Sequence, residues 1–185
     1  MADSPWDMLS AIGTVTAVVV ALGGSGHAAW KARKVDEDHS ELVAAKMLSP
    51  LSELQSTVSY LHSWFCSDDE ETAGQYMSSL IAIQKLEAMA GAISTEDLYP
   101  LLHLKNHAAK RTARALGLIH IFSSDAIATL MHQSWSDVIQ HETYHKKWAE
   151  MLSEIQGHLD VAVSTCKAAA STGAPRPTVE EIHGQ

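Results

Sequence analysis

The sequence predicts an all-α protein, with an N-terminal transmembrane helix followed by a cytosolic antiparallel bundle of four or five helices. No segment alternates apolar and polar residues with the period of two that is typical of a β-strand. Apolar residues instead recur at spacings of three and four over most of the chain. Near the N-terminus, the segment from Met8 to Trp30 contains no Asp, Glu, Lys or Arg.

The composition excludes several classes of protein. A chain of 185 residues suits one domain with an appendage rather than a large multidomain enzyme. With 13 Lys and Arg against 22 Asp and Glu, its net charge of -9 argues against a general nucleic-acid-binding protein. Its 2 Cys cannot form a disulfide scaffold and are typical of reduced cytosolic thiols.

The charge-free segment from Met8 to Trp30 is long enough to cross a hydrocarbon core of about 30 Å as a helix. Trp6 and Trp30 bracket it, at the positions where amphipathic rings favour the two membrane interfaces. Three of the four residues at 31–34 are basic, whereas the N-terminal side carries only acidic charges. The positive-inside rule therefore predicts a single-pass protein of the bacterial inner membrane with its N-terminus outside and its C-terminal domain in the cytoplasm.

Two other interpretations of this segment remain open. Gly26-His27-Ala28 resembles a signal-peptide cleavage site, although the positive region that should precede such a peptide is missing. The glycine-rich end and the modest hydrophobicity also fit a buried core helix of a soluble protein.

Small residues recur every four positions within the segment. They would share one helix face, where they would let two helices approach closely in lipid. These positions are Gly13, Ala17, Ala21 and Ser25. The pattern favours a homo-oligomer packed through this face, with membrane lipid around it.

The sequence Trp-Asp-Met-Leu-Ser-Ala-Ile-Gly-Thr-Val at 6–15, followed by an Ala/Val run and a basic cluster, resembles the N-terminus of small bacterial and prophage single-pass membrane proteins of uncharacterised function. The resemblance covers about the first 35 residues and implies a membrane anchor. Some proteins of this architecture accompany phage-defence systems as membrane effectors. The resemblance thus implies an effector role only by analogy of architecture.

The remaining helices are predicted from the spacing of apolar residues and from residues that typically start or end a helix. A charged helix should continue to Leu48, where Ser49-Pro50 ends it and opens an amphipathic helix to about Phe65. An acidic loop at 67–71 precedes a helix that ends near Gly91.

Further helices follow in the second half of the chain. Ser94 should cap a helix that continues to Phe122, and Ser123-Ser124-Asp125 should break it. A last helix is expected over 126–169, with a bend near Ser134. The prediction therefore divides the chain into an anchor at 1–30, a bundle at 31–169 and a disordered tail at 170–185.

His141-Glu142-Thr143-Tyr144-His145 matches the H-E-x-x-H motif of zinc metalloproteases. In that motif two His on one helix face bind zinc and the Glu acts as a base. The resemblance covers five residues, and the basic 146–147 pair follows where that family has uncharged residues. The alternative is that His141 and His145 belong to the buried stripe of a bundle helix, so no cofactor is expected unless zinc binds here.

A second candidate site is a basic stripe in a region without acidic residues between Leu98 and Ser124. On one continuous helix these side chains would share a face and could bind an anionic ligand, RNA or lipid headgroups. The candidate residues are His103, His107, Lys110, Arg111 and Arg114. The alternative is a solvated face that pairs with acidic helices.

Arg114 and His120 also fit the loose R-x(4-6)-H pattern of HEPN ribonucleases, which are helical bundles. Six residues of a continuous helix rotate by about 600°, which separates these two side chains around the axis. The leading expectation is therefore a non-enzymatic membrane protein that acts by oligomerisation or by binding a protein partner or anionic ligand, and nucleic acid is not an expected partner. The alternative is an enzyme: a metal-dependent hydrolase using Glu142, or a ribonuclease using Arg114 and His120.

Overall fold

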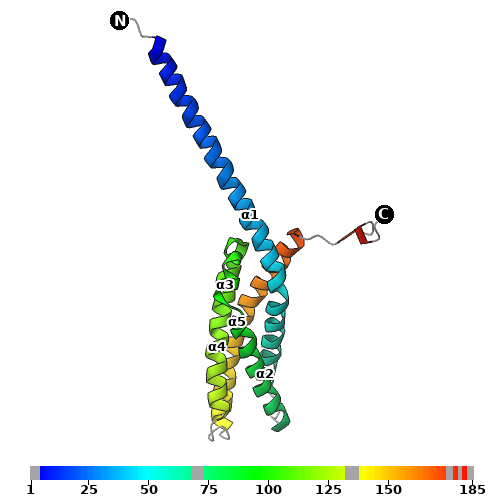
Figure 1. Ribbon diagram of the computed structural model, residues 1–185. Helices are drawn as coiled ribbons and strands as arrows, with labels where there is room; N and C mark the ends of the chain where they lie inside the picture. Colours follow the sequence, from blue (N-terminus) through cyan, green and yellow to red (C-terminus); the bar gives the residue numbers. More distant parts are fainter. Residues whose placement is uncertain (1–4, 68–72, 132–137, 174–176, 179–180, 183–185) are drawn as a thin grey trace. The chain divides into compact units, whose positions relative to one another are not determined.

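The computed structural model describes residues 5–67, 73–131, 138–173, 177–178 and 181–182, and within these ranges every regular element is a helix. The side chains at 5–29, 32, 73–76 and 138–141 lie outside the described part of the structure. The predicted all-α class is confirmed (Figure 1). The elements are α1 (Pro5–Phe65), α2 (Ala73–Gly91), α3 (Thr95–Leu98), the 3-10 turns η1 (Pro100–His103) and η2 (Lys105–His107), α4 (Ala108–Leu130) and α5 (Val138–Gly173).

The chain divides into two compact units, Met1–Asp38 and His39–Gln185. The first unit is helical from Pro5 onward. Near its end Trp30 is exposed, and the ammonium of Lys34 lies 5.9 Å from the centroid of the Trp30 ring. Among the residues that the structure describes, no helix is long and apolar enough to cross a membrane.

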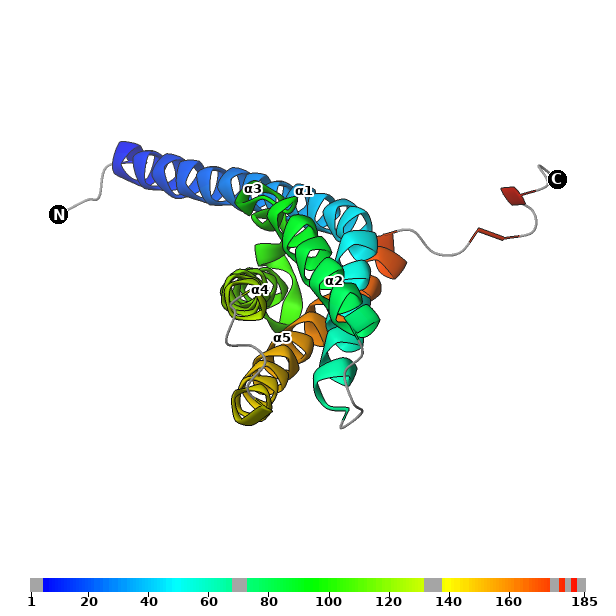
Figure 2. The same cartoon turned by 90° about the horizontal axis from the view of Figure 1, so that it is seen from below.

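The second unit is a helical bundle built around one apolar core. In Figure 1 the second half of α1 and helices α2, α4 and α5 alternate in direction, and Figure 2 shows α4 nearly end-on with α5 and α2 beside it. Each of these helices contributes fully buried side chains at helical spacing, because only one face of each can be removed from water. Together with Leu101 of η1, the largest fully buried side chains are Trp148, Phe122, Leu51, Leu54, Leu61, Ile83, Leu86, Ile119, Leu152, Ile155 and Leu159.

The predicted helix break at Ser49-Pro50 is wrong, because α1 continues through Pro50. Proline has no N–H, so the carbonyl oxygen of Lys46, one turn earlier, has no intrahelical donor at this point. On both sides of the proline, Met47 and Leu51 are buried in the same core. Burial of both turns against the same neighbours offsets the lost hydrogen bond and keeps the helix continuous.

The predicted cap at Ser94 is confirmed, but the long helix predicted after it is wrong. Ser94 and Asp97 form a capping box in which each backbone N–H donates to the other side chain, at 3.2 Å. The helix ends after one turn, and two 3-10 turns follow before α4 begins at Ala108. Asn106 and His107 lie in the left-handed region with φ of 57° and 56°, so the chain changes direction there.

The predicted break at Ser123-Ser124-Asp125 is also wrong, since α4 runs on to Leu130. Ser123 is buried, and Asp125 turns its carboxylate toward α5 instead of capping a new helix. The last helix therefore begins at Val138 and not near 126, and it extends to Gly173. The bend expected near Ser134 falls outside the described residues.

Candidate functional site

The small-residue stripe predicted for membrane packing belongs to α1. Its members, Gly13, Ala17, Ala21 and Ser25, are helical, and their side chains lie outside the described part of the structure. Close helix packing through this face therefore stays a prediction.

The H-E-x-x-H motif lies near the start of α5. Glu142 is exposed, the side chain of His141 lies outside the described part, and His145 is half-buried. The His145 ring packs against aromatic rings of α1, with centroid distances of 5.6 Å to Trp64 and 5.2 Å to Phe65. No group of three His, Cys, Asp or Glu side chains able to hold a metal ion occurs within the described ranges. His145 thus contributes to an aromatic cluster in the bundle.

The ribonuclease-like pair Arg114 and His120 lies on α4, but the structure does not bring the two side chains together. Arg114 donates to the Glu154 carboxylate of α5 with its Nη2 3.1 Å from Oε1. The Nδ1 atom of His120 lies 3.5 Å from the Glu87 carboxylate of α2. Each of the two side chains faces a different neighbouring helix.

The basic stripe is divided by the change of direction at Asn106 and His107. His103 belongs to η1, upstream of this change, whereas Lys110 and Arg111 belong to α4. The stripe was predicted on one continuous helix, and the left-handed residues break that register. His103 is therefore separated from the α4 members by a non-helical connection.

Three residues of the predicted basic stripe do lie at one site. His107, Lys110 and Arg111 line a shallow opening of about 300 Å³ together with His158 of α5. All four lining residues are basic or become cationic on protonation, and none is acidic. The opening can therefore receive an anionic group, in a chain whose net charge is -9.

The connection before α4 is held in place by side-chain contacts. The Asn106 amide donates to Thr165 Oγ1 of α5 at 3.4 Å, and the Nε of Arg111 donates to the Asn106 carbonyl at 3.0 Å. His107 occupies the N-cap position but makes no side-chain capping hydrogen bond, and the first turn of α4 has no acidic residue. The positive end of the helix dipole therefore adds to the positive potential beside the opening.

One carboxylate lies close to this group of basic residues. Glu154 Oε1 is 3.7 Å from His158 Nε2, as well as receiving the hydrogen bonds of Arg114. Glu154 thus lies beside both Arg114, which does not line the opening, and His158, which does. The other ring nitrogen of His158, Nδ1, is buried and has no hydrogen-bond partner among the described residues.

His158 is the member of this site that the sequence did not indicate. It lies about fifty positions after Lys110, in the middle of an otherwise ordinary bundle helix. No spacing along the chain links the two, because their proximity depends on how α5 packs on α4. A count of histidines on exposed helix faces could have suggested His158 as a candidate, but not its partners.

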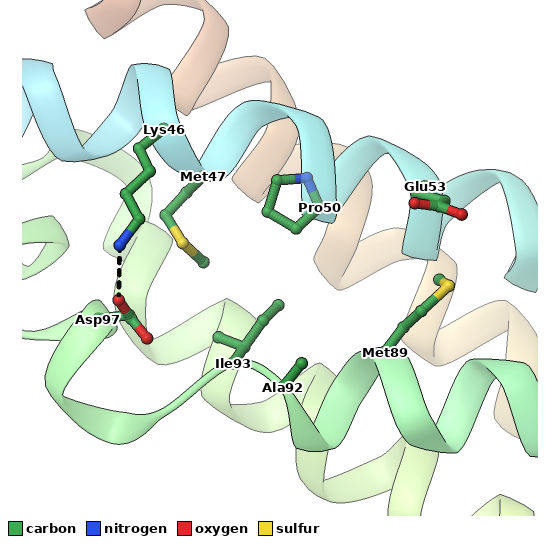
Figure 3. Close-up of a pocket in the computed structure, with 8 residues that line it drawn as sticks. All are labelled: Lys46, Met47, Pro50, Glu53, Met89, Ala92, Ile93 and Asp97. Atoms are coloured by element: carbon green, nitrogen blue, oxygen red, sulfur yellow. Dashed lines mark hydrogen bonds and ion pairs between the residues drawn. The ribbon is translucent and has the colours of Figure 1, made fainter.

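A second cavity of about 240 Å³ lies between α1 and the end of α2 (Figure 3). The Lys46 ammonium and the Asp97 carboxylate form an ion pair of 3.3 Å at one side of it. Most of its wall is apolar and includes two thioethers. The lining residues are Lys46, Met47, Pro50, Glu53, Met89, Ala92, Ile93 and Asp97. Because its charged residues are paired with each other or with Lys85, this cavity has fewer groups available to orient a ligand than the basic opening.

No known protein family, curated protein or solved structure matches this sequence.

Proposed function

We propose that the protein is a non-enzymatic, single-pass membrane protein whose helical bundle lies on the cytoplasmic side and acts by self-association or by binding. The observation that carries this proposal is the charge-free segment from Met8 to Trp30, followed at once by basic residues at 31–34. This order of apolar segment and basic cluster is typical of a helix inserted with its C-terminal end inside. The N-terminal resemblance supports a narrower form of the proposal, a membrane effector of phage defence.

The residues at the C-terminal end of the charge-free segment support the same orientation in the membrane. Trp30 exposes 61% of its surface, and Lys34 lies over its ring at 5.9 Å. An exposed indole beside a long cationic side chain is suited to the headgroup region, where the ring is partly desolvated and the ammonium reaches water or lipid phosphate.

The arrangement of the bundle favours binding over catalysis. Arg114 and His120 face different helices, and His145 is packed among aromatic rings. The basic opening between α4 and α5 offers cationic side chains but no nucleophile beside a general base. It is suited to holding an anionic group in place.

Fractionation of the full-length chain tests the anchor. We expect it in the membrane fraction, resistant to high salt and alkaline carbonate and released by detergent. Val19→Arg places a charge near the centre of the segment, at a cost of about 2.5–3.5 kcal/mol, and should move much of the chain to the soluble fraction. Val35→Arg, at an exposed position beyond the segment, is the matched control and should stay in the membrane. Recovery of the intact wild-type chain without detergent contradicts the anchor.

Light scattering in detergent tests self-association separately. Ala17→Leu adds bulk to the small-residue stripe and should lower the mass of the particle, whereas Val18→Leu on another helix face should not. If the Ala17→Leu particle keeps the wild-type mass, packing through this stripe is wrong while the anchor stands.

A further inference from the structure

We propose that the opening lined by His107, Lys110, Arg111 and His158 binds the phosphate group of a small phosphorylated molecule, either free or as a lipid headgroup. This inference goes beyond membrane anchoring, because it assigns a ligand class to a site in the bundle. It replaces the single-helix stripe that the sequence predicted with a site shared by two helices.

The cations of the bundle differ in whether a carboxylate neutralises them. Four basic side chains elsewhere have carboxylate partners, in the pairs Lys46–Asp97, Lys85–Glu53, Arg114–Glu154 and Lys147–Asp125. Within the part of the chain that the structure describes, Lys110 and Arg111 have no carboxylate partner, and neither do Lys105 and Lys167. Of these four, Lys110 and Arg111 line the opening. In an acidic chain, two adjacent cations without a counter-charge leave a local positive potential that an anion can neutralise.

The backbone conformation before α4 also supports a phosphate site at this opening. His107 has a φ of 56°, in the left-handed region that residues with a Cβ atom seldom adopt. This conformation places His107 beside Lys110 and Arg111 at the opening, next to the uncapped first turn of α4. The Ala108 N–H already donates to the Lys105 carbonyl, so the helix start contributes the positive end of its dipole.

The number and kind of donors select a phosphate over a carboxylate. A phosphate monoester presents three terminal oxygens and up to two negative charges, which match the Lys110 ammonium, the Arg111 guanidinium and the His107 imidazole. An opening of about 300 Å³ suits one such group rather than an extended polyanion. The net charge of -9 would further oppose a nucleic acid chain.

The test is calorimetric titration of the full-length chain in a neutral detergent with inorganic phosphate. We expect saturable binding that is weakened at least about tenfold in Lys110→Gln/Arg111→Gln, because two charge-assisted contacts are lost. Lys46→Gln/Lys85→Gln is the matched control, since it removes the same charge from paired lysines outside the opening. Its affinity should stay within about twofold of wild type. Absence of saturable binding, or an equal loss in both double variants, overturns the proposal.

A second variant separates binding from folding. His107→Gly relieves the left-handed strain and should leave the thermal midpoint unchanged or higher, yet reduce phosphate affinity about three- to tenfold. Wild-type phosphate affinity in this variant would contradict the assignment of His107 to the site.

Two further titrants distinguish the source of the phosphate. If the bound phosphate belongs to a lipid headgroup, short-chain phosphatidic acid, used below its micelle concentration, should bind at least about tenfold more tightly than glycerol 3-phosphate. If the ligand is instead a free phosphorylated metabolite, glycerol 3-phosphate should bind as tightly as phosphatidic acid or more tightly. Failure of all phosphate titrations with a membrane-bound chain rejects this inference alone, whereas phosphate binding by a soluble chain rejects only the anchor.

Discussion

The carboxylate of Asp125 accepts a hydrogen bond of 2.8 Å from the indole nitrogen of Trp148, which joins the C-terminal part of α4 to α5. The same oxygen accepts a hydrogen bond of 2.9 Å from Lys147 Nζ. Trp148 has no exposed surface and packs edge-on against Phe65 at 5.1 Å. This contact gives a polar end to the aromatic cluster and fixes the rotation of α5 against α4.

Asp125→Ala should destabilise the bundle by about 1–3 kcal/mol, because it removes the carboxylate that accepts a hydrogen bond from the buried Trp148. Asp125→Asn keeps an acceptor oxygen and should lose less. Glu150→Ala removes an exposed carboxylate from α5 and should change the free energy of unfolding by less than about 0.5 kcal/mol. Chemical denaturation followed by helical circular dichroism measures all three, and equal stability of Asp125→Ala and wild type would refute this role for Asp125.

Acid should weaken the same contact. Burial tends to raise the pKa of Asp125, but the hydrogen bonds from Lys147 and Trp148 outweigh it and lower the pKa below its usual value of 3.8. A carboxylate with a lowered folded-state pKa contributes stability above its unfolded pKa and loses this contribution as pH falls through the folded value. The wild type should therefore lose more stability than Asp125→Asn as pH decreases below about 4. Parallel acid profiles of the two proteins would argue against this ionised pair.

Pro50→Ala should stabilise α1 by about 1–3 kcal/mol, because alanine restores the N–H donor to the Lys46 carbonyl and removes the ring from the helix interior. Ser49→Ala, at the neighbouring exposed position, is the control and should gain about 0.5 kcal/mol or less. Thermal and urea unfolding compare the two. A loss of stability in Pro50→Ala would mean that the proline ring contributes more by lining the cavity between α1 and α2 than it costs the helix.

The two cysteines should react with a thiol reagent at very different rates. Cys66 is exposed, whereas Cys166 is buried, and burial raises the pKa of the Cys166 thiol to about 11. At pH 8 about one in a thousand Cys166 side chains would be the reactive thiolate. We expect one fast equivalent of a disulfide reagent in the native chain and a second only after denaturation. Cys66→Ser should abolish the fast phase, and Cys166→Ser should leave it intact.

Several parts of the fold followed directly from local sequence. The spacing of Leu51, Leu54, Val58 and Leu61 predicted one buried helix face, and all four side chains are buried. Ser94 with an acid three residues later predicted a helix start, and the capping box is present. These features depend on residues one turn apart, so the sequence alone contains the information.

The wrong predictions concern helix ends, where tertiary contacts outweighed the local signals for breaking or continuing a helix. Pro50 and Ser123-Ser124-Asp125 carry ordinary helix-breaking signals, but buried neighbours keep both helices continuous. In the opposite direction, the residues between Leu98 and Ala108 carry a helical pattern but adopt 3-10 turns and left-handed backbone. Local propensities of up to about 1 kcal/mol per residue, and about 3 kcal/mol for proline, are outweighed by packing contacts over several buried side chains.

By itself, the sequence determined that this protein is helical, where its charge-free segment lies and which faces of its helices are buried. These properties follow from hydrophobic periodicity and charge, which act over one or two turns of chain. Only the tertiary structure decided that His158 joins Lys110 and Arg111 at one opening, while His103 and Arg114 do not. The physical reason is that a site shared by α4 and α5 depends on the left-handed turn at Asn106 and His107 and on the packing of two distant helices.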